Sequence, residues 1–316
     1  MKQSCKILFK IKKYFINLLR FVLIFGISFI ILYPLITKLS VSIMPESDFY
    51  NPTVGWIPTK VTLNHYITVW RNMNYPVAFF NTFVLSLSVS ILQLIACTIV
   101  GYGLARFQFK AKGIIFFSII FTLVVPPQMI STPLYLNFRF FDFFGLFPNS
   151  INLINSYWPF LLTSLTATGF QNGLFIYIMR QFFLGMPKNL EEAAYIDGAG
   201  LFKTFYRVML PGAKAALLVV FLFAFVWQYN DYFFTMLYLE NGNYLPQALA
   251  SLIHSLTLAY ESQGMNVGNP NNFFGEHYLS ILNNTGMLLV ISPLLIMYSF
   301  LQRFFIESIE RTGLVG

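Results

Sequence analysis

Charged residues are scarce in this chain of 316 residues. Asp, Glu, Lys and Arg make up 10% of the sequence, whereas about a quarter of a soluble globular domain is charged. Hydrophobic residues reach 57% and aromatic residues alone 19%. This composition excludes an ordinary soluble domain and predicts a protein that crosses a membrane several times. The net charge of +8 does not indicate a nucleic-acid partner, because the basic residues lie in short clusters beside apolar runs.

Cysteine and histidine are also rare, and their spacing excludes several kinds of site. The two cysteines, Cys5 and Cys97, are too few and too far apart for a disulfide framework. No His, Cys, Asp or Glu cluster has the spacing of metal ligands, and we predict surface positions for His65, His254 and His277. The sequence contains no phosphate-binding Gly-x-x-x-x-Gly-Lys-Ser/Thr loop and no nucleophile paired with a base. We therefore predict that the chain is not an enzyme and holds no metal or cofactor of its own.

Long stretches without charged residues predict an all-α membrane protein with six transmembrane helices. About 20 apolar residues cross the hydrocarbon core. The predicted spans are residues 21–43, roughly 79–103, 113–138, a helix within 143–179, 215–239 and 277–302. Pro126 and Pro127 predict a kink or a local break in the third span. The predicted organisation is a basic tail (1–20), a first transmembrane helix (21–43), a five-helix core (78–305) and a C-terminal tail (306–316).

The basic residues predict which side of the membrane each loop occupies. With both termini inside, sixteen of the twenty Lys and Arg residues lie in cytoplasmic segments and four lie outside. This asymmetry follows the positive-inside rule. It places the loop 187–211 in the cytoplasm and the loop 241–280 outside.

The loop 187–211 is the most charged and glycine-rich segment between two apolar spans. Pro187 and the carboxylates of Glu191 and Glu192 favour the start of a helix, and Gly198 and Gly200 favour its end. Apolar residues at helical spacing then predict a second short helix that ends near Pro211. From the residues alone, a capped surface loop explains the pattern as well as a functional element does.

The spacing within this loop resembles a known motif. Glu192-Ala193-Ala194, three residues, Gly198, nine residues, Val208, one residue and Leu210-Pro211 are similar to the EAA loop of permease subunits of ATP-binding-cassette importers. Val208 stands where that family often has Ile. The resemblance implies that the loop is the cytoplasmic coupling element, which contacts an ATPase subunit. The implied coupling residues are Glu192, Ala193, Ala194, Asp197, Gly198, Val208, Leu210 and Pro211.

The resemblance extends over nearly the whole chain. Asn81–Phe107, Pro126-Pro127, Pro58–Tyr66, Trp227–Tyr232 and the tail from Gln302 resemble carbohydrate-type permeases such as the smaller permease of the maltose transporter, with the MetI-like transmembrane fold. This implies a multi-pass protein of the cell membrane that imports a sugar or oligosaccharide. The implied partners are a second related permease, two ATPase subunits that bind the ATP, an extracytoplasmic substrate-binding protein and the lipid bilayer. A permease for amino acids, peptides or phosphate is the alternative, and a membrane enzyme or channel is a second one.

Two further groups of residues are candidates for contacts with solute and partner. Polar and aromatic residues of the fourth and fifth spans form a candidate substrate pathway, although Asp231 fits a helix-capping role equally well and interfacial aromatics are often membrane anchors. These residues are Trp158, Trp227, Gln228, Asn230 and Asp231. The outer loop 241–280 is long and polar, and predicts either a flexible connector or, by the resemblance, a contact with the binding protein. Its candidate contact residues are Gln263, Asn266, Asn269 and Asn271.

Overall fold

The described part of the chain folds into helices joined by turns and loops. The computed structural model describes residues 2–49, 51, 54–142 and 149–313, and these residues form helices and no β-strand. The predicted all-α class is therefore confirmed. The chain divides into one unit of Met1–Asn72 with Leu252–Leu289 and a second unit of Met73–Ser251 with Val290–Gly316. The helix α17 (Glu276–Gly313) contributes to both units.

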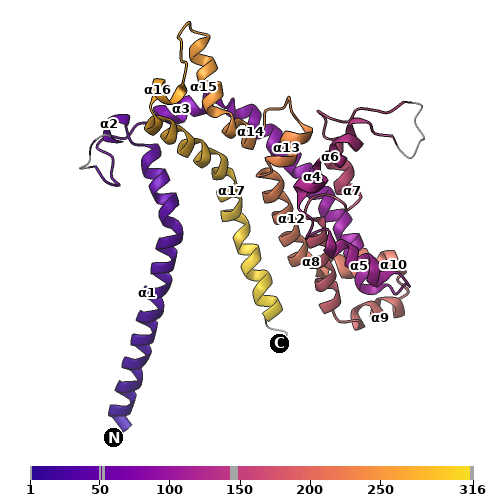
Figure 1. The fold of residues 1–316 in the computed structure, drawn as a ribbon. Coiled ribbons are helices and arrows are strands. Elements are labelled where there is room, and N and C mark those ends of the chain that lie inside the picture. The colour runs from indigo at the N-terminus through magenta and orange to yellow at the C-terminus, as the bar shows by residue number, and fades with distance from the viewer. Residues whose placement is uncertain (1, 50, 52–53, 143–148, 314–316) are drawn as a thin grey trace. The chain divides into compact units, whose positions relative to one another are not determined.

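The first unit combines a long N-terminal helix with short helices from two distant parts of the chain (Figure 1). They are α1 (Lys2–Ser42), α2 (Glu46–Phe49), α3 (Asn64–Asn72), α15 (Leu252–Glu261), α16 (Pro270–Phe274) and the first part of α17. Lys38 of α1 donates a hydrogen bond to Asn284 Oδ1 at 2.6 Å. His65 is buried at 6% exposure, and its Nε2 lies 2.9 Å from the Met44 carbonyl oxygen. The predicted surface position of His65 is therefore wrong, because its ring completes the hydrogen bonding of a backbone turn.

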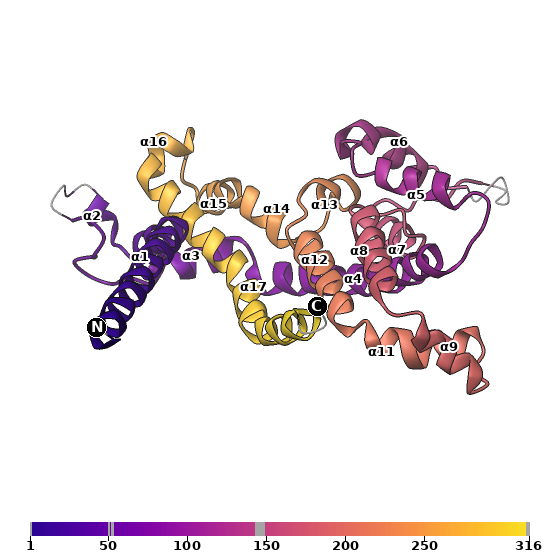
Figure 2. The same cartoon turned by 90° about the horizontal axis from the view of Figure 1, so that it is seen from below.

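The second unit is built around α4, which packs most extensively against α8 and α12 (Figure 2). Its elements are α4 (Tyr75–Arg106), α5 (Lys112–Phe121), α6 (Pro127–Arg139), α7 (Trp158–Leu165), α8 (Asn172–Gly185), α9 (Asn189–Ile196), α10 (Leu201–Thr204), the π-helix η1 (Phe205–Met209), α11 (Leu210–Gly212), α12 (Lys214–Tyr229), α13 (Phe233–Tyr238) and α14 (Leu245–Ala250). Gly101 allows α4 to approach α8 closely, since a Cβ at this position would lie 2.7 Å from Met179 Cβ. Small residues at such crossings let membrane helices pack backbone to backbone.

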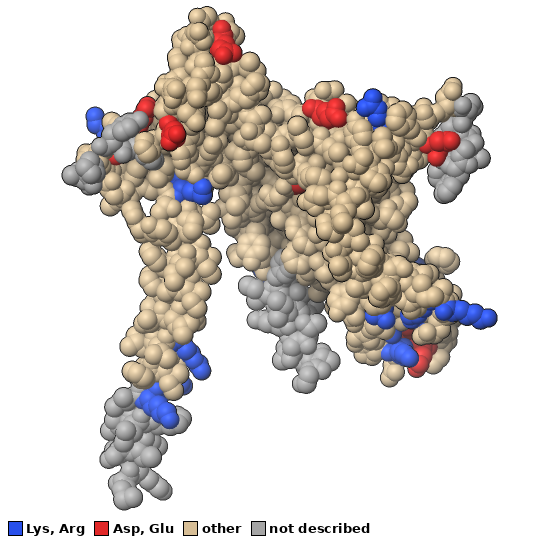
Figure 3. Space-filling model, in the orientation of Figure 1, with Lys and Arg blue, Asp and Glu red and all other residues tan. Residues whose placement is uncertain are grey.

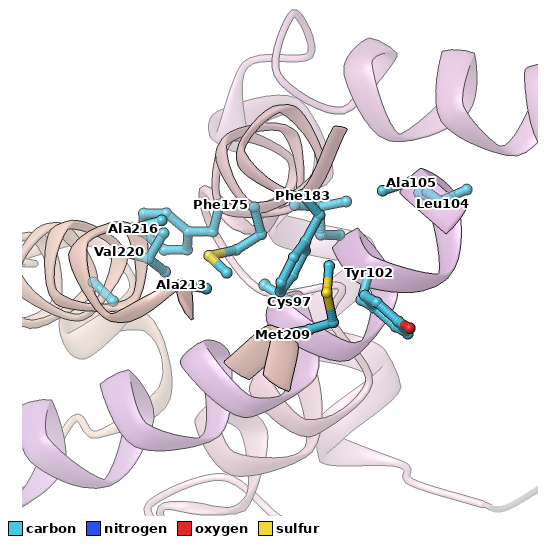
Figure 4. Packing of buried hydrophobic residues seen from close by; sticks show 13 residues of the cluster. Cys97, Tyr102, Leu104, Ala105, Phe175, Phe183, Met209, Ala213, Ala216 and Val220 are labelled. Carbon is cyan, nitrogen blue, oxygen red and sulfur yellow. The ribbon is translucent and has the colours of Figure 1, made fainter. Parts of the chain in front are cut away.

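The core of this unit lies where α4, α8, η1 and α12 meet (Figure 4). Phe175, Met179, Phe183, Met209 and Val220 are all fully buried there. The ring of Tyr102 packs against Phe183 with centroids 5.2 Å apart. Met209 therefore anchors the C-terminal end of the loop 187–211 in the same core that holds α4 and α8.

Among the described residues, three helices are long and apolar enough to cross a membrane: Lys12–Ser42, Tyr75–Arg106 and Glu276–Arg303. A fourth span exists if Leu201–Gly212 and Lys214–Tyr229 count as one, although they are bent by 76°. The predicted break at Pro126 and Pro127 is confirmed, because α5 ends at Phe121 and α6 begins at Pro127. The predicted fourth span is also divided, into α7 and α8, while residues 143–148 of that segment lie outside the described residues. The six-span topology and the cytoplasmic termini therefore remain predictions.

The outer loop 241–280 contains more helix than its polar sequence suggests. Leu252 and Leu256 are buried on one face of α15, as the helical spacing of these leucines predicts. A further helical turn, α16, follows a stretch with positive φ at Gly264 and Gly268. At the C-terminus, α17 continues to Gly313 through the predicted tail, and residues 314–316 lie outside the described part.

Candidate functional site

The loop 187–211 forms the predicted pair of short helices. The helix α9 carries Glu191 and Glu192 in its first turn, where carboxylates favour the positive end of a helix dipole. Gly198 ends it with φ of 76°, and Gly200 precedes α10 in an extended conformation. Figures 1 and 2 show this pair beyond the end of α8.

Gly198 occupies a position that only glycine adopts without strain. The Gly198 amide donates to the Tyr195 carbonyl at 3.0 Å, and the Ala199 amide donates to the Ala194 carbonyl at 2.9 Å. These two bonds and the positive φ form a Schellman motif, which satisfies the last carbonyls of α9. A Cβ at Gly198 would meet no atom within 4 Å. The requirement for glycine is therefore conformational rather than steric.

A buried ion pair attaches α9 to the end of α4. Glu191 is only 9% exposed; its Oε2 lies 3.3 Å from Arg106 Nε, and its Oε1 accepts a hydrogen bond from the Tyr102 hydroxyl at 2.9 Å. Arg106 also donates from its second guanidinium nitrogen to the Met186 carbonyl at 2.9 Å. The sequence-based list named Glu192 and omitted Glu191, because no pattern within the loop distinguishes the buried carboxylate from the exposed one.

The opposite surface of the loop is apolar and open to solvent. Phe202 is 91% exposed, Ile196 86% and Tyr206 70%. Large apolar side chains gathered on one exposed surface mark a protein interaction site. The helical spacing of apolar residues predicted this second helix, but it gave no sign that these side chains are uncovered.

The residues predicted to couple the loop to an ATPase divide between this surface and the core. Glu192, Ala193, Asp197, Gly198 and Pro211 are exposed, Ala194 is buried, and Val208 and Leu210 are half-buried. Ala194 supports the loop from inside, together with buried Met209. The structure thus brings the motif together in one helical pair, although only part of it faces outward.

A cavity of about 620 Å³ lies between α4, α5, α7, α8 and α12 of the same unit. Trp227, Gln228 and Asp231 of the predicted substrate pathway line it, whereas Trp158 and Asn230 do not. Polar residues from other elements also face it, and sequence analysis missed them because they are scattered along apolar helices. They are Gln93, Ser118, Thr122, Thr163, Ser164, Thr168 and Gln171.

Gln228 and Asp231 differ in what their polar atoms contact. The side-chain nitrogen of Gln228 is buried and has no hydrogen-bond partner among the described residues. Asp231 lies between α12 and α13, not inside a helix as predicted. Its oxygens accept hydrogen bonds from the Phe234 amide at 3.2 Å and from the Thr235 amide and hydroxyl at 2.9 Å. Asp231 therefore caps α13, and Gln228 is the lining residue with an unused donor.

Trp227 is held by aromatic neighbours. Its ring stacks on Phe175 with centroids 5.6 Å apart and on Phe223 with centroids 5.8 Å apart. Trp158 is 55% exposed, and Asn230 donates to the Val226 carbonyl at 2.8 Å. Gln228 therefore combines a place in the cavity wall with a buried donor that has no hydrogen-bond partner in the described structure.

The predicted receptor-contact residues lie in the first unit, on and before α16. Gln263, Asn266 and Asn271 are exposed. Asn269 is exposed too, but its Oδ1 accepts a hydrogen bond from the Asn271 amide at 3.0 Å and caps α16. The phenyl ring of Phe274 packs edge-on against Tyr260 of α15, with centroids 5.0 Å apart. The loop is thus partly folded by its own aromatic residues.

The family match and the similar proteins all belong to transport systems. Residues 97–311 match the family described as binding-protein-dependent transport system inner membrane component. The arabinooligosaccharides transport system permease protein of Halalkalibacterium halodurans is 25% identical over 92% of this chain and 93% of its own length. The maltodextrin transport system permease protein of Bacillus subtilis is 29% identical over 81% of each chain.

A solved structure shares the fold. The crystal structure of a bacterial ABC transporter involved in the import of the acidic polysaccharide alginate contains a chain that superposes with a TM-score of 0.66. It is 24% identical and covers 92% of this chain and 96% of its own. The two chains therefore share a fold over almost their whole length.

Proposed function

The chain belongs to the family of binding-protein-dependent transport system inner membrane components, and on that premise we propose that it is the permease subunit that couples sugar or oligosaccharide import to a separate ATPase through the loop 187–211. The family consists of transporter permeases of the membrane and not of enzymes, which agrees with the apolar spans of this chain. Membership also implies that the chain works with a second permease, an ATPase and a binding protein. One copy beside a related permease, on two ATPase subunits, is the arrangement we propose.

The exposed apolar surface of the loop 187–211 is the observation that carries the coupling proposal. Phe202 and Ile196 are almost fully exposed, a costly arrangement in water that a protein partner would relieve. The same loop is fastened to α4 through Glu191 and to the core through Met209. A force applied by a partner to Phe202 would therefore reach the long helices rather than only bend the loop.

Sugar or oligosaccharide is the solute class we propose. Relatives named for arabinooligosaccharides and maltodextrin match over most of the chain. The cavity in the second unit agrees with a neutral hydroxylated solute, because hydroxyl and amide groups line it and its carboxylate, Asp231, is occupied in capping α13. Import of amino acids, peptides or phosphate is the alternative.

The topology we propose has six spans with both termini in the cytoplasm. It is tested by replacing Leu190 and Asn266, both exposed, one at a time with cysteine in a background without Cys5 and Cys97. A membrane-impermeant thiol reagent should label position 266 from outside and position 190 only after the membrane is opened. Labelling of both from one face would overturn the topology.

Coupling is tested in the complete transporter reconstituted in vesicles. Glu192→Lys reverses an exposed charge beside the apolar surface while leaving the buried Glu191 network intact. We expect the variant to insert and fold normally, but to lose sugar uptake or the binding protein's stimulation of ATP hydrolysis. Leu258→Lys, at another exposed position, on α15, is the control. Unchanged uptake and ATPase association in Glu192→Lys would contradict the coupling role.

A further inference from the structure

A second pocket, of about 500 Å³, lies beside the loop 187–211 and has the Arg106–Glu191 pair in its wall. It is lined by residues from the ends of α4, α5 and α8 and from α9: Ala105, Arg106, Gln108, Lys112, Arg180, Leu184, Lys188, Glu191, Glu192 and Tyr195. Four of these residues are basic and two are acidic. Figure 3 shows basic side chains gathered at the end of this unit that carries α9 and α10.

Some charged side chains of the pocket are paired with an opposite charge and others are not. Glu191 is already paired with Arg106 and accepts the hydroxyl of Tyr102, and Glu192 is exposed to solvent. Lys112 donates one hydrogen bond to the Phe107 carbonyl at 2.9 Å, which leaves two of its three protons. Because the Arg106–Glu191 pair neutralises itself, Lys112, Arg180 and Lys188 outnumber the one remaining carboxylate, that of Glu192.

Arg180 combines a fixed guanidinium with an unpaired donor. Its guanidinium carbon lies 4.1 Å from the centroid of the Phe116 ring, a stacked position that holds the group in place. Stacking engages the face of the guanidinium and leaves its N–H groups in the plane free to donate. Its Nε is buried and has no hydrogen-bond partner among the described residues. A buried charged donor without an acceptor is costly unless an anion supplies one.

The pocket also borders an apolar helix. None of the residues of α5 is buried, and Ile114, Phe117 and Phe121 are 72%, 69% and 56% exposed. Lys112 is the first residue of this helix, and Phe116, which carries the Arg180 guanidinium, is on its second turn. The cations therefore lie at one end of an exposed apolar helix. Basic pockets between membrane helices suit phospholipid headgroups.

We propose that this pocket binds the phosphate of an anionic membrane phospholipid, with Arg180 and Lys188 as the main contacts and Lys112 at the rim. The phosphodiester supplies the acceptor that the Arg180 Nε lacks, and the acyl chains lie against α5. A free phosphate compound shares the same chemistry, but it gains nothing from α5. The lipid is therefore expected to bind more tightly than the free anion.

The test uses the purified complete transporter in a neutral detergent, with binding followed by the unfolding temperature of this subunit and by native mass spectrometry. The probes are dioctanoyl phosphatidylglycerol, dioctanoyl phosphatidylcholine and inorganic phosphate. We expect the anionic lipid alone to raise the unfolding temperature. We expect Lys188→Gln to weaken its binding about fivefold, from ~1 kcal/mol for each basic residue near an anionic headgroup.

Two comparisons separate a site from general surface charge. Lys110→Gln removes an exposed lysine close in sequence that does not line the pocket, and should leave lipid binding unchanged. Arg180→Lys keeps the charge but loses the planar donors, and should weaken binding as Arg180→Gln does. Lys188 is exposed, so its variant tests the proposal even if Arg180 variants fail to fold. Equal binding by Lys188→Gln and Lys110→Gln, or an equal effect of inorganic phosphate, would overturn the proposal.

Discussion

Arg106, the last residue of α4, forms a buried ion pair with Glu191 in the first turn of α9, with 3.3 Å between Nε and Oε2. The two residues are far apart in the sequence, and the pair directly links α4, which is long and apolar enough to cross a membrane, to the segment that we expect to meet an ATPase. Its side chains are 7% and 11% exposed, so water contributes little to satisfying them. The end of α4 and the start of α9 should therefore move as one body.

Removing Glu191 should separate these two helices. Glu191→Gln leaves a buried Arg106 without its counter-ion, and a broken buried pair costs about 3–5 kcal/mol. We expect a clear fall in the unfolding temperature of the subunit and a loss of solute uptake that exceeds the loss of ATP hydrolysis. Tyr102→Phe removes only the hydrogen bond to a charged group, worth about 1.5–3 kcal/mol, and should have a smaller effect. Glu192→Gln, on the same helix but exposed, is the control for stability and should not lower it.

The effect of replacing Gly198 should depend on how readily the new residue adopts a positive φ, and not on the size of its side chain. Its φ of 76° disfavours a residue with a Cβ by roughly 1–2 kcal/mol, although there is open space around it. Gly198→Ala and Gly198→Asp should therefore reduce uptake, and Gly198→Asn should reduce it least, since Asn enters this region more readily. Gly200, in an extended conformation, provides the control as Gly200→Ala. Equal uptake by Gly198→Ala and wild type would show that the Schellman turn is not required.

Gln228 should contribute to solute selectivity in the cavity. Gln228→Leu keeps a similar volume while removing the buried nitrogen that has no partner in the described structure. If that nitrogen donates to a sugar hydroxyl, its loss should raise the half-saturating solute concentration about threefold to tenfold, from ~0.5–1.5 kcal/mol for a neutral hydrogen bond. Uptake at several solute concentrations measures this directly. Asn230→Leu, outside the cavity, should leave the half-saturating concentration unchanged.

Asp231 should behave as a helix cap and not as a solute ligand. Asp231→Asn retains an acceptor for the amides of α13, and Asn caps helices about as well as Asp. Asp231→Ala leaves those amides unpaired and should destabilise the subunit by about 1 kcal/mol. We therefore expect normal uptake from the Asn variant and a lowered unfolding temperature from the Ala variant. A large loss of uptake in Asp231→Asn at unchanged stability would instead assign the carboxylate to transport.

The outer loop should matter for stimulation by the binding protein. Gln263→Ala together with Asn266→Ala alters two exposed side chains and leaves the Asn269 cap of α16 in place. We expect lower receptor-stimulated ATP hydrolysis with normal basal hydrolysis, because the loop 187–211 is untouched. The same outcome is expected for deletion of residues 262–272, with a larger effect since that deletion also removes the start of α16. If the binding protein stimulates ATP hydrolysis by the double variant as fully as by the wild type, the loop is only a connector.

Sequence patterns predicted the local features of this molecule and missed the contacts between distant segments. Gly198 ends a helix and the Pro126-Pro127 pair interrupts one through the backbone conformation of these residues themselves. Both effects could therefore be predicted from the sequence, and the structure confirms them. Glu191 could not be separated from Glu192, because its burial depends on Tyr102 and Arg106, more than eighty residues earlier. Asp231 was placed within a helix because apolar residues continue past it, whereas its own side chain ends the run by capping α13. His65 was misjudged for the same reason, since its partner is a carbonyl in another turn.

The π-helix between α10 and α11 makes the length of the coupling loop as important as its composition. Phe205–Met209 form a wider turn than the α-helices on either side, and such a turn holds one residue more than an α-helical turn would. Deleting a single residue there would allow an ordinary α-helix. The part of the loop that precedes the deletion would then be rotated by about 100° around the helix axis. Phe202 would then point to a different side while Met209 stayed in the core. Exchange of an exposed residue in this segment should therefore leave that direction unchanged, but an insertion or deletion of one residue should abolish docking. The nine-residue interval between Gly198 and Val208 sets the direction in which the apolar surface faces.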